Sequence, residues 1–433
     1  MSEESLSADY GLLRPNFSLK PTEDPGIFVG RPDVKERLES RLLRAINTQT
    51  TFSTIIFGDY GSGKTHALNY VVYFLKEKKL DMEPIFVRQP KLSEKSTPAD
   101  LFTSIINSIS IDRVFDLLRK TGEALEKDLR KAEDLSDRVK IIDTLVGYRD
   151  LSVIINKFLE EKVDEYLVRK WFSGQKLSGK EKSQLGVVSD TFDPYAAAQV
   201  ATALFGLLRK ITHKEILLML DEMEGIVEVR AKRQPEFSNF LRPLLEETSG
   251  ISVLMAFSHK GTIGEGPLIF QPDQPVGGRV GYPQNYIHLM EFNSMESTER
   301  FIKELLSAEG IRKTDLGSLV SRAKKRTNET VTNDYYPFTK EAVQAIFQLT
   351  VEQSSILLLP RVILKILTSC LGEAIQQRKP VIDSQIVQRV LTEIASESEE
   401  VERKEAFWST SLQEKFKSLE EGRRRESEAK RDI

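Results

Sequence analysis

The hydrophobic residues of this chain form short uninterrupted runs, separated by longer stretches with helical spacing. Five runs have the length of buried strands: TFSTIIFG at 51–58, PIFVRQP at 84–90, EILLMLDE at 215–222, ISVLMAFS at 251–258 and YIHLMEF at 286–292. Apolar runs of this kind, with helical patterns between them, predict strands that are covered on both faces. We therefore expect an α/β fold with a parallel five-stranded sheet.

The helical stretches suggest how the chain is organised. Before the first strand, Pro32 suits a first helical turn, and Val34, Leu38, Leu42 and Leu43 are spaced to share one apolar face. A periodic, charged segment of about residues 95–213 separates the second and third strands and is too long to be a loop. We predict an N-terminal arm (1–26), a core (27–293) with this helical insertion, a helical lid domain (294–395) and a charged tail (396–433).

Composition narrows the class of protein. The 433 residues are 40% hydrophobic and 29% charged, which is usual for a soluble globular protein, and no apolar run approaches the roughly 20 residues of a membrane span. The N-terminus lacks the pattern of a secretory signal, so we expect a cytoplasmic protein without a membrane partner. Cys370 is the only cysteine, which excludes an internal disulfide. The net charge of −3 means that any contact with DNA must be local or must come from an oligomer.

The stretch FGDYGSGKTHALNY carries the clearest chemical signal. Its glycines bracket four residues and are followed by Lys and Thr, which is the P-loop pattern, and a predicted strand and helix flank it. In such a loop the backbone amides hold phosphates, the lysine reaches the β and γ phosphates, and the threonine hydroxyl binds Mg²⁺. A chance glycine-rich turn is the alternative. The predicted nucleotide-binding residues here are Gly58, Asp59, Tyr60, Gly61, Ser62, Gly63, Lys64, Thr65 and His66.

A second motif, ILLMLDEMEG, ends the third predicted strand. Asp221 is placed to bind Mg²⁺ together with Thr65, and Glu222 could orient or deprotonate a water that attacks the γ phosphate. An acidic turn after a buried strand is the alternative, but the upstream P-loop makes the pair more specific. A site that only binds ATP has little need of Glu222, so the motif favours hydrolysis with ATP and Mg²⁺ as cofactors.

Together these motifs resemble the AAA+ ATPases, most closely the origin-recognition and replication-initiator branch and related proteins of prokaryotic defence and transposition systems. The resemblance covers about residues 27–395 and implies an AAA+ core with a helical lid. It assigns Val29, Gly30 and Arg31 to the element near the adenine. The polar sensor at the end of the fourth strand falls on Ser258, where asparagine is more usual.

The same resemblance assigns two arginines. The lid sensor falls on Arg361, and an arginine finger that completes a neighbouring subunit's site falls on Arg279, with Arg242 as its rival. Each arginine could instead be an ordinary surface residue. A finger implies a homo-oligomer.

The resemblance leaves the partners open. Members of the initiator branch usually carry a winged-helix domain after the lid, and the residues that follow the lid here are too few for one, which disfavours sequence-specific DNA reading. We expect an ATPase that couples turnover to DNA-associated assembly or remodelling in defence, transposition, replication or repair, with an effector such as a nuclease, helicase or transposase. The alternative is a slow nucleotide-gated adaptor that recruits effectors without binding DNA.

Overall fold

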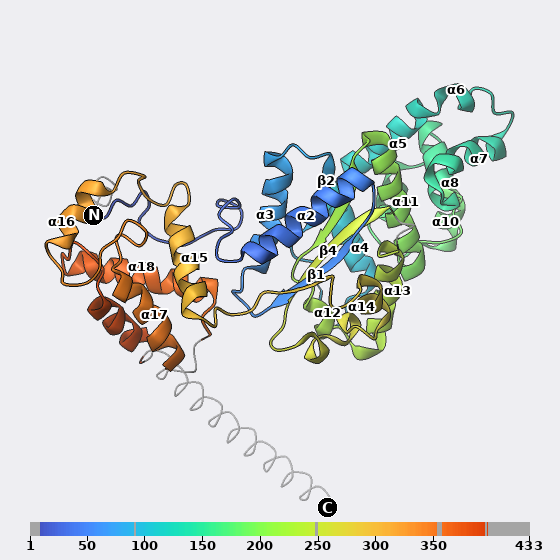
Figure 1. Cartoon of the computed structure of the whole chain (residues 1–433). Helices are drawn as coiled ribbons and strands as arrows, with labels where there is room; N and C mark the ends of the chain where they lie inside the picture. The colour runs from blue at the N-terminus through green and yellow to red at the C-terminus, as the bar shows by residue number, and fades with distance from the viewer. Residues whose placement is uncertain (1–8, 91, 247–249, 353–356, 395, 397–433) are drawn as a thin grey trace, which may run out of the picture. The chain divides into compact units, whose positions relative to one another are not determined.

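The computed structural model describes residues 9–90, 92–246, 250–352, 357–394 and 396. The chain divides into two units, one made of residues 19–291 and the other of the described parts of 1–18 and 292–433 (Figure 1). The predicted charged tail, apart from Ser396, lies outside the described residues. In the described residues, no helix has both the length and the apolar character that crossing a membrane would take.

A five-stranded sheet forms the centre of the first unit. Its strands are β1 (Ser53–Gly58), β2 (Met82–Val87), β3 (Glu215–Leu220), β4 (Ile251–Ser258) and β5 (Tyr286–His288). They are ordered β2-β3-β4-β1-β5, and every pair is parallel. The predicted parallel five-stranded α/β sheet is therefore confirmed. The strand predicted at 84–90 begins and ends earlier, at Met82–Val87. Of the strand predicted at 286–292, only the first three residues pair with a neighbouring strand.

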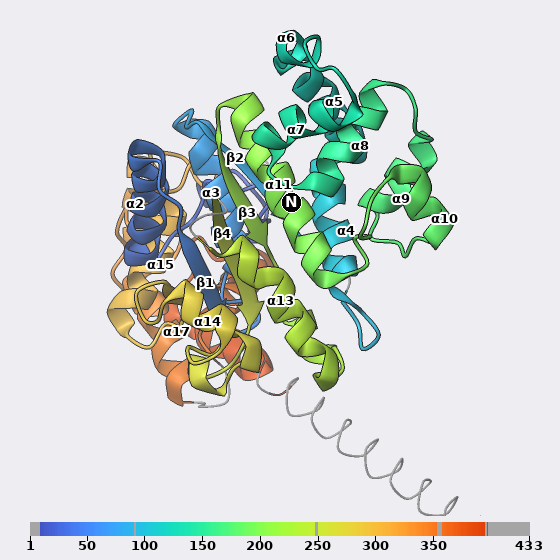
Figure 2. The ribbon, with the colours of Figure 1, turned by 90° about the vertical axis from the view of Figure 1, so that its right-hand side faces the viewer.

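Helices cover both faces of this sheet, as Figure 2 shows. On one face, α2 (Pro32–Thr48) and α3 (Lys64–Glu77) pack against Ile56, Leu217 and Leu254. On the other face lie α4 (Pro98–Ile109), α11 (Pro194–Thr212) and α13 (Gln234–Leu244). Neighbouring strand residues point to opposite faces, so a continuous apolar run supplies both cores.

The face of α2 differs in one residue from the expectation. Val34, Leu38 and Leu42 are buried, but Leu43 is 39% exposed, and Ala45 is buried instead. Leu43 follows Leu42 directly, and a step of one residue turns a helix by about 100°, which carries the side chain away from the sheet. The fourth buried position therefore falls three residues after Leu42.

The segment between β2 and β3 is helical over most of its length. Beyond α4 it contains α5 (Ile111–Ala124), α6 (Glu126–Leu129), α7 (Leu135–Val146), α8 (Arg149–Leu159), α9 (Glu165–Phe172) and α10 (Gly179–Leu185), and α11 leads back to the sheet. Trp171 is fully buried there, and its indole N–H donates to the Ser189 carbonyl at 3.2 Å. The core of this segment is continuous with the core under the sheet.

After β4 the chain forms α14 (Pro275–Val280) and then β5, and the second unit follows. That unit contains α15 (Met295–Ser307), α16 (Gly317–Lys324), α17 (Lys340–Glu352), α18 (Pro360–Gln376) and a helix over 384–394. Its described residues contain isolated bridges but no extended strand.

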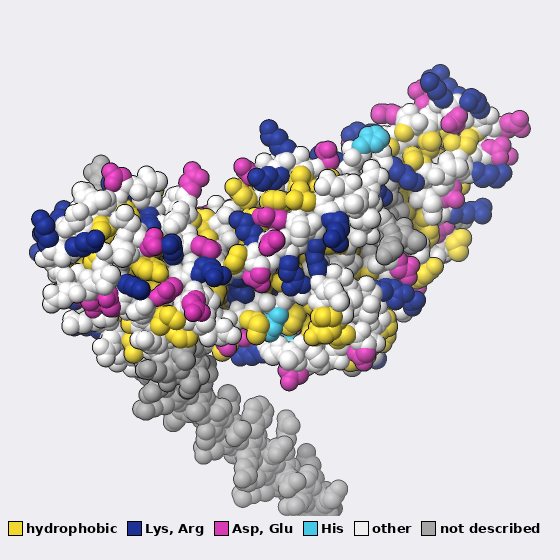
Figure 3. Space-filling view, in the orientation of Figure 1, with side chains coloured by type: hydrophobic (Ala, Val, Ile, Leu, Met, Phe, Trp, Pro, Cys, Tyr) yellow, Lys and Arg dark blue, Asp and Glu magenta, His cyan; other side chains and the backbone are white. Residues whose placement is uncertain are grey.

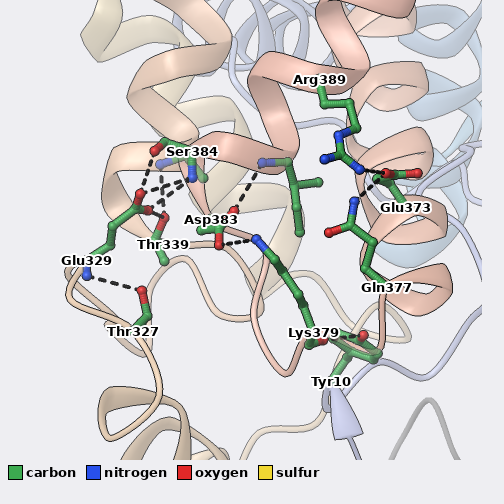
Figure 4. Close-up of polar contacts among 12 residues, drawn as sticks. Tyr10, Thr327, Glu329, Thr339, Glu373, Gln377, Lys379, Asp383, Ser384 and Arg389 are labelled. Carbon is green, nitrogen blue, oxygen red and sulfur yellow. Dashed lines mark hydrogen bonds and ion pairs between the residues drawn. The ribbon is translucent and has the colours of Figure 1, made fainter.

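Polar contacts hold the end of this second unit together (Figure 4). Glu329 accepts hydrogen bonds from the Thr339 hydroxyl at 2.6 Å and from the Ser384 amide at 3.1 Å, which fixes the start of the last helix. The Tyr10 hydroxyl donates to the Lys379 carbonyl at 2.6 Å. Leu12 and Phe17 are buried in the same unit. Residues 9–18 are thus an integral part of the C-terminal helical unit.

Candidate nucleotide-binding site

The P-loop residues connect β1 to α3. Gly58 has φ +156°, and a Cβ there would lie 2.6 Å from the carbonyl oxygen of Leu289, so no larger residue fits without a shift. Gly63 has φ +99°, and a Cβ there would point into open space. The loop thus combines a closely packed start with an open end at the first turn of α3, where amide groups can hold an anion.

Lys64 is almost fully buried at the beginning of α3. Its ammonium donates to the carbonyl oxygens of Gly58 at 3.0 Å and Asp59 at 2.8 Å. Burial lowers the pKa of Lys64, and the negative charges of Glu224, Asp221, Asp59 and Glu222 oppose that shift, Glu224 most strongly. The lysine is therefore surrounded by more negative charge than it can balance.

Asp221 lies directly after β3, with its amide donating to the Val87 carbonyl at 3.0 Å. Its side chain is 1% exposed, and burial raises its pKa to about 6, while the nearby Thr65 hydroxyl and the Glu222 amide act in the opposite direction. Thr65 and Asp221 are far apart in the sequence, and the fold brings them together at the carboxyl edge of the sheet.

Several buried polar atoms at this edge have no hydrogen-bond partner within the described part of the chain. They are the Ser62 Oγ, one Asp59 oxygen and one Asp221 oxygen. Such atoms are rare in folded proteins and call for an explanation. A bound nucleotide would offer phosphate oxygens that accept from the Ser62 hydroxyl, and a metal ion with its waters would engage the carboxylate oxygens.

These residues suit Mg²⁺ bound together with a nucleotide. The described residues contain no group of three or more Asp, Glu, His or Cys side chains able to hold a metal ion by themselves. Mg²⁺ commonly takes only one or two protein ligands and completes its shell with phosphate oxygens and waters. Thr65 and Asp221 fit that pattern, and the surplus of carboxylates favours a divalent cation.

The raised pKa of Asp221 predicts that this residue destabilises the protein when no metal is bound. Because its folded pKa of about 6 exceeds the usual 3.8, the charged form is disfavoured by folding, and stability falls as the pH rises from about 4 to about 6. We expect Asp221→Asn, with EDTA present, to raise the free energy of unfolding by roughly 2 to 3 kcal/mol at about pH 7.5. Urea unfolding measures this, and the gain should shrink at about pH 5. An equal gain at both pH values would show that the buried charge of Asp221 is not the cause.

Glu222 follows Asp221 and extends into solvent. Its backbone has φ +53°, the left-handed region, and its amide donates to Asp221 Oδ1 at 3.0 Å. A non-glycine residue in this region carries a conformational cost that is often found at functional sites. Glu222 is thus exposed next to the buried Asp221, and its charge acts on the Lys64 ammonium.

The segment before α2 lies against the P-loop helix. Phe28 is buried and stacks on Tyr70, with ring centroids 5.3 Å apart, and on His66 at 6.3 Å. The Arg31 guanidinium donates to the Met290 carbonyl at 2.6 Å. Val29 and Gly30 lie in the sequence between Phe28 and Arg31, the two residues that make these contacts. Their assignment to the adenine stays a prediction.

Ser258 ends β4 directly opposite Gly58 of β1. Its amide donates to Glu224 Oε2 at 3.0 Å, a contact that the sequence reasoning missed although Glu224 belongs to the same ILLMLDEMEG motif. Ser258 therefore lies beside the start of the P-loop, and its role as a polar sensor stays a prediction.

The two finger candidates lie beside the same carboxylate. Arg279, in the last turn of α14, pairs with Glu246 at 3.3 Å and donates to the Pro275 carbonyl at 3.4 Å. Arg242, in the last turn of α13, lies 3.9 Å from the same Glu246 oxygen. Sequence reasoning weighed the two arginines against each other but did not predict that they share a carboxylate.

Arg361 belongs to the other unit. It is the second residue of α18 and is exposed there. Its role as a lid sensor stays a prediction.

No protein-family model matches this chain, and no curated protein matches it. Solved structures that are similar to it include Cdc6p from Pyrobaculum aerophilum, with a TM-score of 0.44 and 12% identity over 84% of this chain and 66% of that one. The Orc1 protein of Aeropyrum pernix in complex with DNA has a TM-score of 0.43 and 13% identity over 85% and 66%. A Walker-type ATPase of Pyrococcus abyssi has a TM-score of 0.39 and 14% identity over 90% and 79%.

The chain spans just under two thirds of the Cdc6p and Orc1 chains. These neighbours include the initiator branch that the motifs resemble. At such identities and TM-scores, the likeness assigns no activity to this chain.

Proposed function

We propose that this chain binds ATP with Mg²⁺ and hydrolyses it, as an AAA+ ATPase that works in an oligomer. The observation that carries the proposal is the meeting of Lys64, Thr65 and Asp221 at one edge of the sheet, where all three are partly or fully buried. Two motifs far apart in the sequence contribute to this cluster. A structural protein with a vestigial loop would have no need to bury a lysine among four carboxylates.

Each residue has a separate task in this proposal. Lys64 would contact the β and γ phosphates, and the amides around Gly61 and Gly63 would hold the phosphate chain. Thr65 and Asp221 would hold Mg²⁺, which when bound neutralises the charge that develops on the phosphates. Glu222 would take a proton from the attacking water as the bond between the γ phosphorus and the bridging oxygen breaks, giving ADP and phosphate.

The test is phosphate release by the purified chain with ATP, with and without Mg²⁺. Turnover that requires Mg²⁺ is expected, and a failure to bind ATP at about millimolar concentration would end the proposal.

We further propose that turnover is coupled to DNA-associated assembly or remodelling. On the face seen in Figure 3, cationic and anionic side chains are interspersed, so that face does not offer DNA a wholly basic surface. Stimulation of ATP turnover by DNA that disappears at high salt would support phosphate contacts.

Arg279 is proposed as the residue that completes the site of a neighbouring subunit. In the single chain Arg279 pairs with Glu246, which lies two residues after the end of α13. Arg279→Ala should reduce ATP turnover per subunit by at least about tenfold, because a finger stabilises charge in the transition state. Wild-type turnover per subunit should rise with protein concentration, and the variant should lose that rise.

Arg242→Ala is the matched control for this prediction, since Arg242 contacts the same Glu246 oxygen. If Arg242→Ala abolishes the concentration dependence and Arg279→Ala keeps it, the finger is Arg242. If neither substitution changes turnover, neither arginine completes a neighbouring subunit's site.

A second candidate is the nucleotide-gated adaptor, for which exposed side chains of the insertion would provide the contact surface. Tyr166 and Tyr195 are each 64% exposed, and Val188 is 84% exposed. Large apolar side chains at the surface are typical of protein contacts when they gather in one region. Recovery of an effector protein with ATP but not with ADP, together with slow turnover, would favour this candidate.

A further inference from the structure

The second glutamate of the ILLMLDEMEG motif, Glu224, is more buried than the exposed Glu222. After Asp221 the chain turns along the edge of β4, where the Met223 amide donates to the Ala256 carbonyl at 3.0 Å. Glu224 is half-buried and accepts a hydrogen bond from the Ser258 amide through Oε2 at 3.0 Å. The motif therefore attaches β3 to the last residue of β4 through a side chain.

That attachment point lies beside the P-loop. Ser258 is opposite Gly58 in the register of β4 and β1, and the next amide, of His259, donates to the Gly58 carbonyl at 3.0 Å. The same Gly58 carbonyl accepts from the Lys64 ammonium. A continuous set of contacts thus joins Glu224 to the end of β4, to the start of the P-loop and to the phosphate-binding lysine.

The charges around the Lys64 ammonium also single out Glu224. Of the four carboxylates that act on the Lys64 ammonium, Glu224 has the strongest effect and Glu222 the weakest. Glu222 is exposed on its left-handed turn, whereas Glu224 is half-buried and directed inward to Ser258. The two glutamates of one motif thus occupy different environments, which suits different tasks.

We propose that Glu224 is a positioning residue for ATP hydrolysis, which holds the end of β4 and with it the Ser258 hydroxyl against the P-loop. The inference rests on the proposed ATPase function. Glu224 acts through the Ser258 backbone, so its contribution is the placement of a polar group beside the phosphates. Misplacement of such a group slows turnover, while the binding of ATP by the P-loop amides and Lys64 continues.

Substitutions at position 224 separate the hydrogen bond from the charge. Glu224→Gln keeps a side-chain oxygen that can accept from the Ser258 amide, whereas Glu224→Ala removes it. Glu224→Asp keeps the charge but is one methylene shorter. We expect Glu224→Ala and Glu224→Asp to lower kcat about tenfold or more, in line with the loss of a hydrogen bond to a charged group, with KM for ATP within about threefold of wild type. Glu224→Gln should keep kcat within about threefold of wild type.

Glu228→Ala is the matched control, because Glu228 is exposed four residues further along the same segment and should keep wild-type turnover. Thermal melting of each variant shows whether it folds, and Glu224→Asp provides the test if Glu224→Ala does not fold. The inference is overturned if Glu224→Ala and Glu224→Asp turn over ATP like wild type. It is equally overturned if Glu224→Gln is as slow as Glu224→Ala, since the charge and not the hydrogen bond would then matter.

The outcome also distinguishes this inference from the proposed function. If wild type hydrolyses ATP and Glu222→Gln does not, while Glu224→Ala keeps the wild-type rate, only the role of Glu224 is refuted. If wild type does not hydrolyse ATP at all, the proposed function itself is refuted.

Discussion

Glu222→Gln should leave a protein that binds ATP and barely hydrolyses it. The amide cannot accept the proton of the attacking water, and general-base catalysis typically contributes a factor of about 10² to 10⁴, so kcat should fall at least about 100-fold. The substitution preserves the size of the side chain, and the left-handed backbone at φ +53° costs the same for Gln as for Glu. Folding and ATP affinity should therefore remain close to wild type. Single-turnover phosphate release and equilibrium ATP titration measure the two quantities.

The control for this substitution is Glu228→Gln, which makes the same chemical change on an exposed residue of the same segment. Its turnover should match wild type. If Glu222→Gln retained turnover, the proton would have to go to another group, and Glu224 would be the first to consider because it lies near Lys64. A large loss of ATP affinity in Glu222→Gln would instead assign this residue to binding.

Lys64→Ala should strongly weaken ATP binding. The ammonium is the cation of the P-loop, and a hydrogen bond to a charged group contributes about 1.5 to 3 kcal/mol, so the Kd for ATP should rise by at least about tenfold. The substitution also leaves Asp59, Asp221, Glu222 and Glu224 without their shared cation. Their negative charge would then repel the triphosphate, so the affinity that remains should depend more steeply on Mg²⁺ than in wild type.

Isothermal titration of ATP over a range of Mg²⁺ concentrations measures this effect. Lys76→Ala, which removes an exposed lysine near the end of the same helix, is the control and should bind ATP like wild type. Unchanged affinity in Lys64→Ala would mean that the P-loop amides alone hold the nucleotide.

Much of the sheet and of the site could be predicted because their signals are local. A buried parallel strand is a continuous apolar run, and the P-loop places its glycines, Lys64 and Thr65 within a few residues of one another. Asp221 could be included because it directly follows such a run. The edge at which these residues meet follows from the rule that parallel strands present their carboxyl ends together.

Other features depend on contacts between segments that the sequence does not connect. Glu224 has the same spacing in the sequence whether it faces solvent or Ser258, and the hydrogen bond exists only because β3 and β4 are neighbours. The common partner of Arg242 and Arg279 depends on the packing of α13 beside α14. The exposure of Leu43 could have been anticipated from the helical angle between neighbours, since Ala45 completes the buried face better.

The contribution of residues 9–18 to the C-terminal helical unit has a topological consequence. The chain passes between the two units twice, once after Ser18 and once before Phe292. A protease that cuts only the second passage would produce two fragments that do not correspond to the two units, because the N-terminal fragment keeps Tyr10, Leu12 and Phe17. The fragments would stay associated through those side chains and would separate only when the helical unit unfolds. Removal of the first 18 residues, in contrast, would take away part of the core of the helical unit, whose other residues begin only at Phe292.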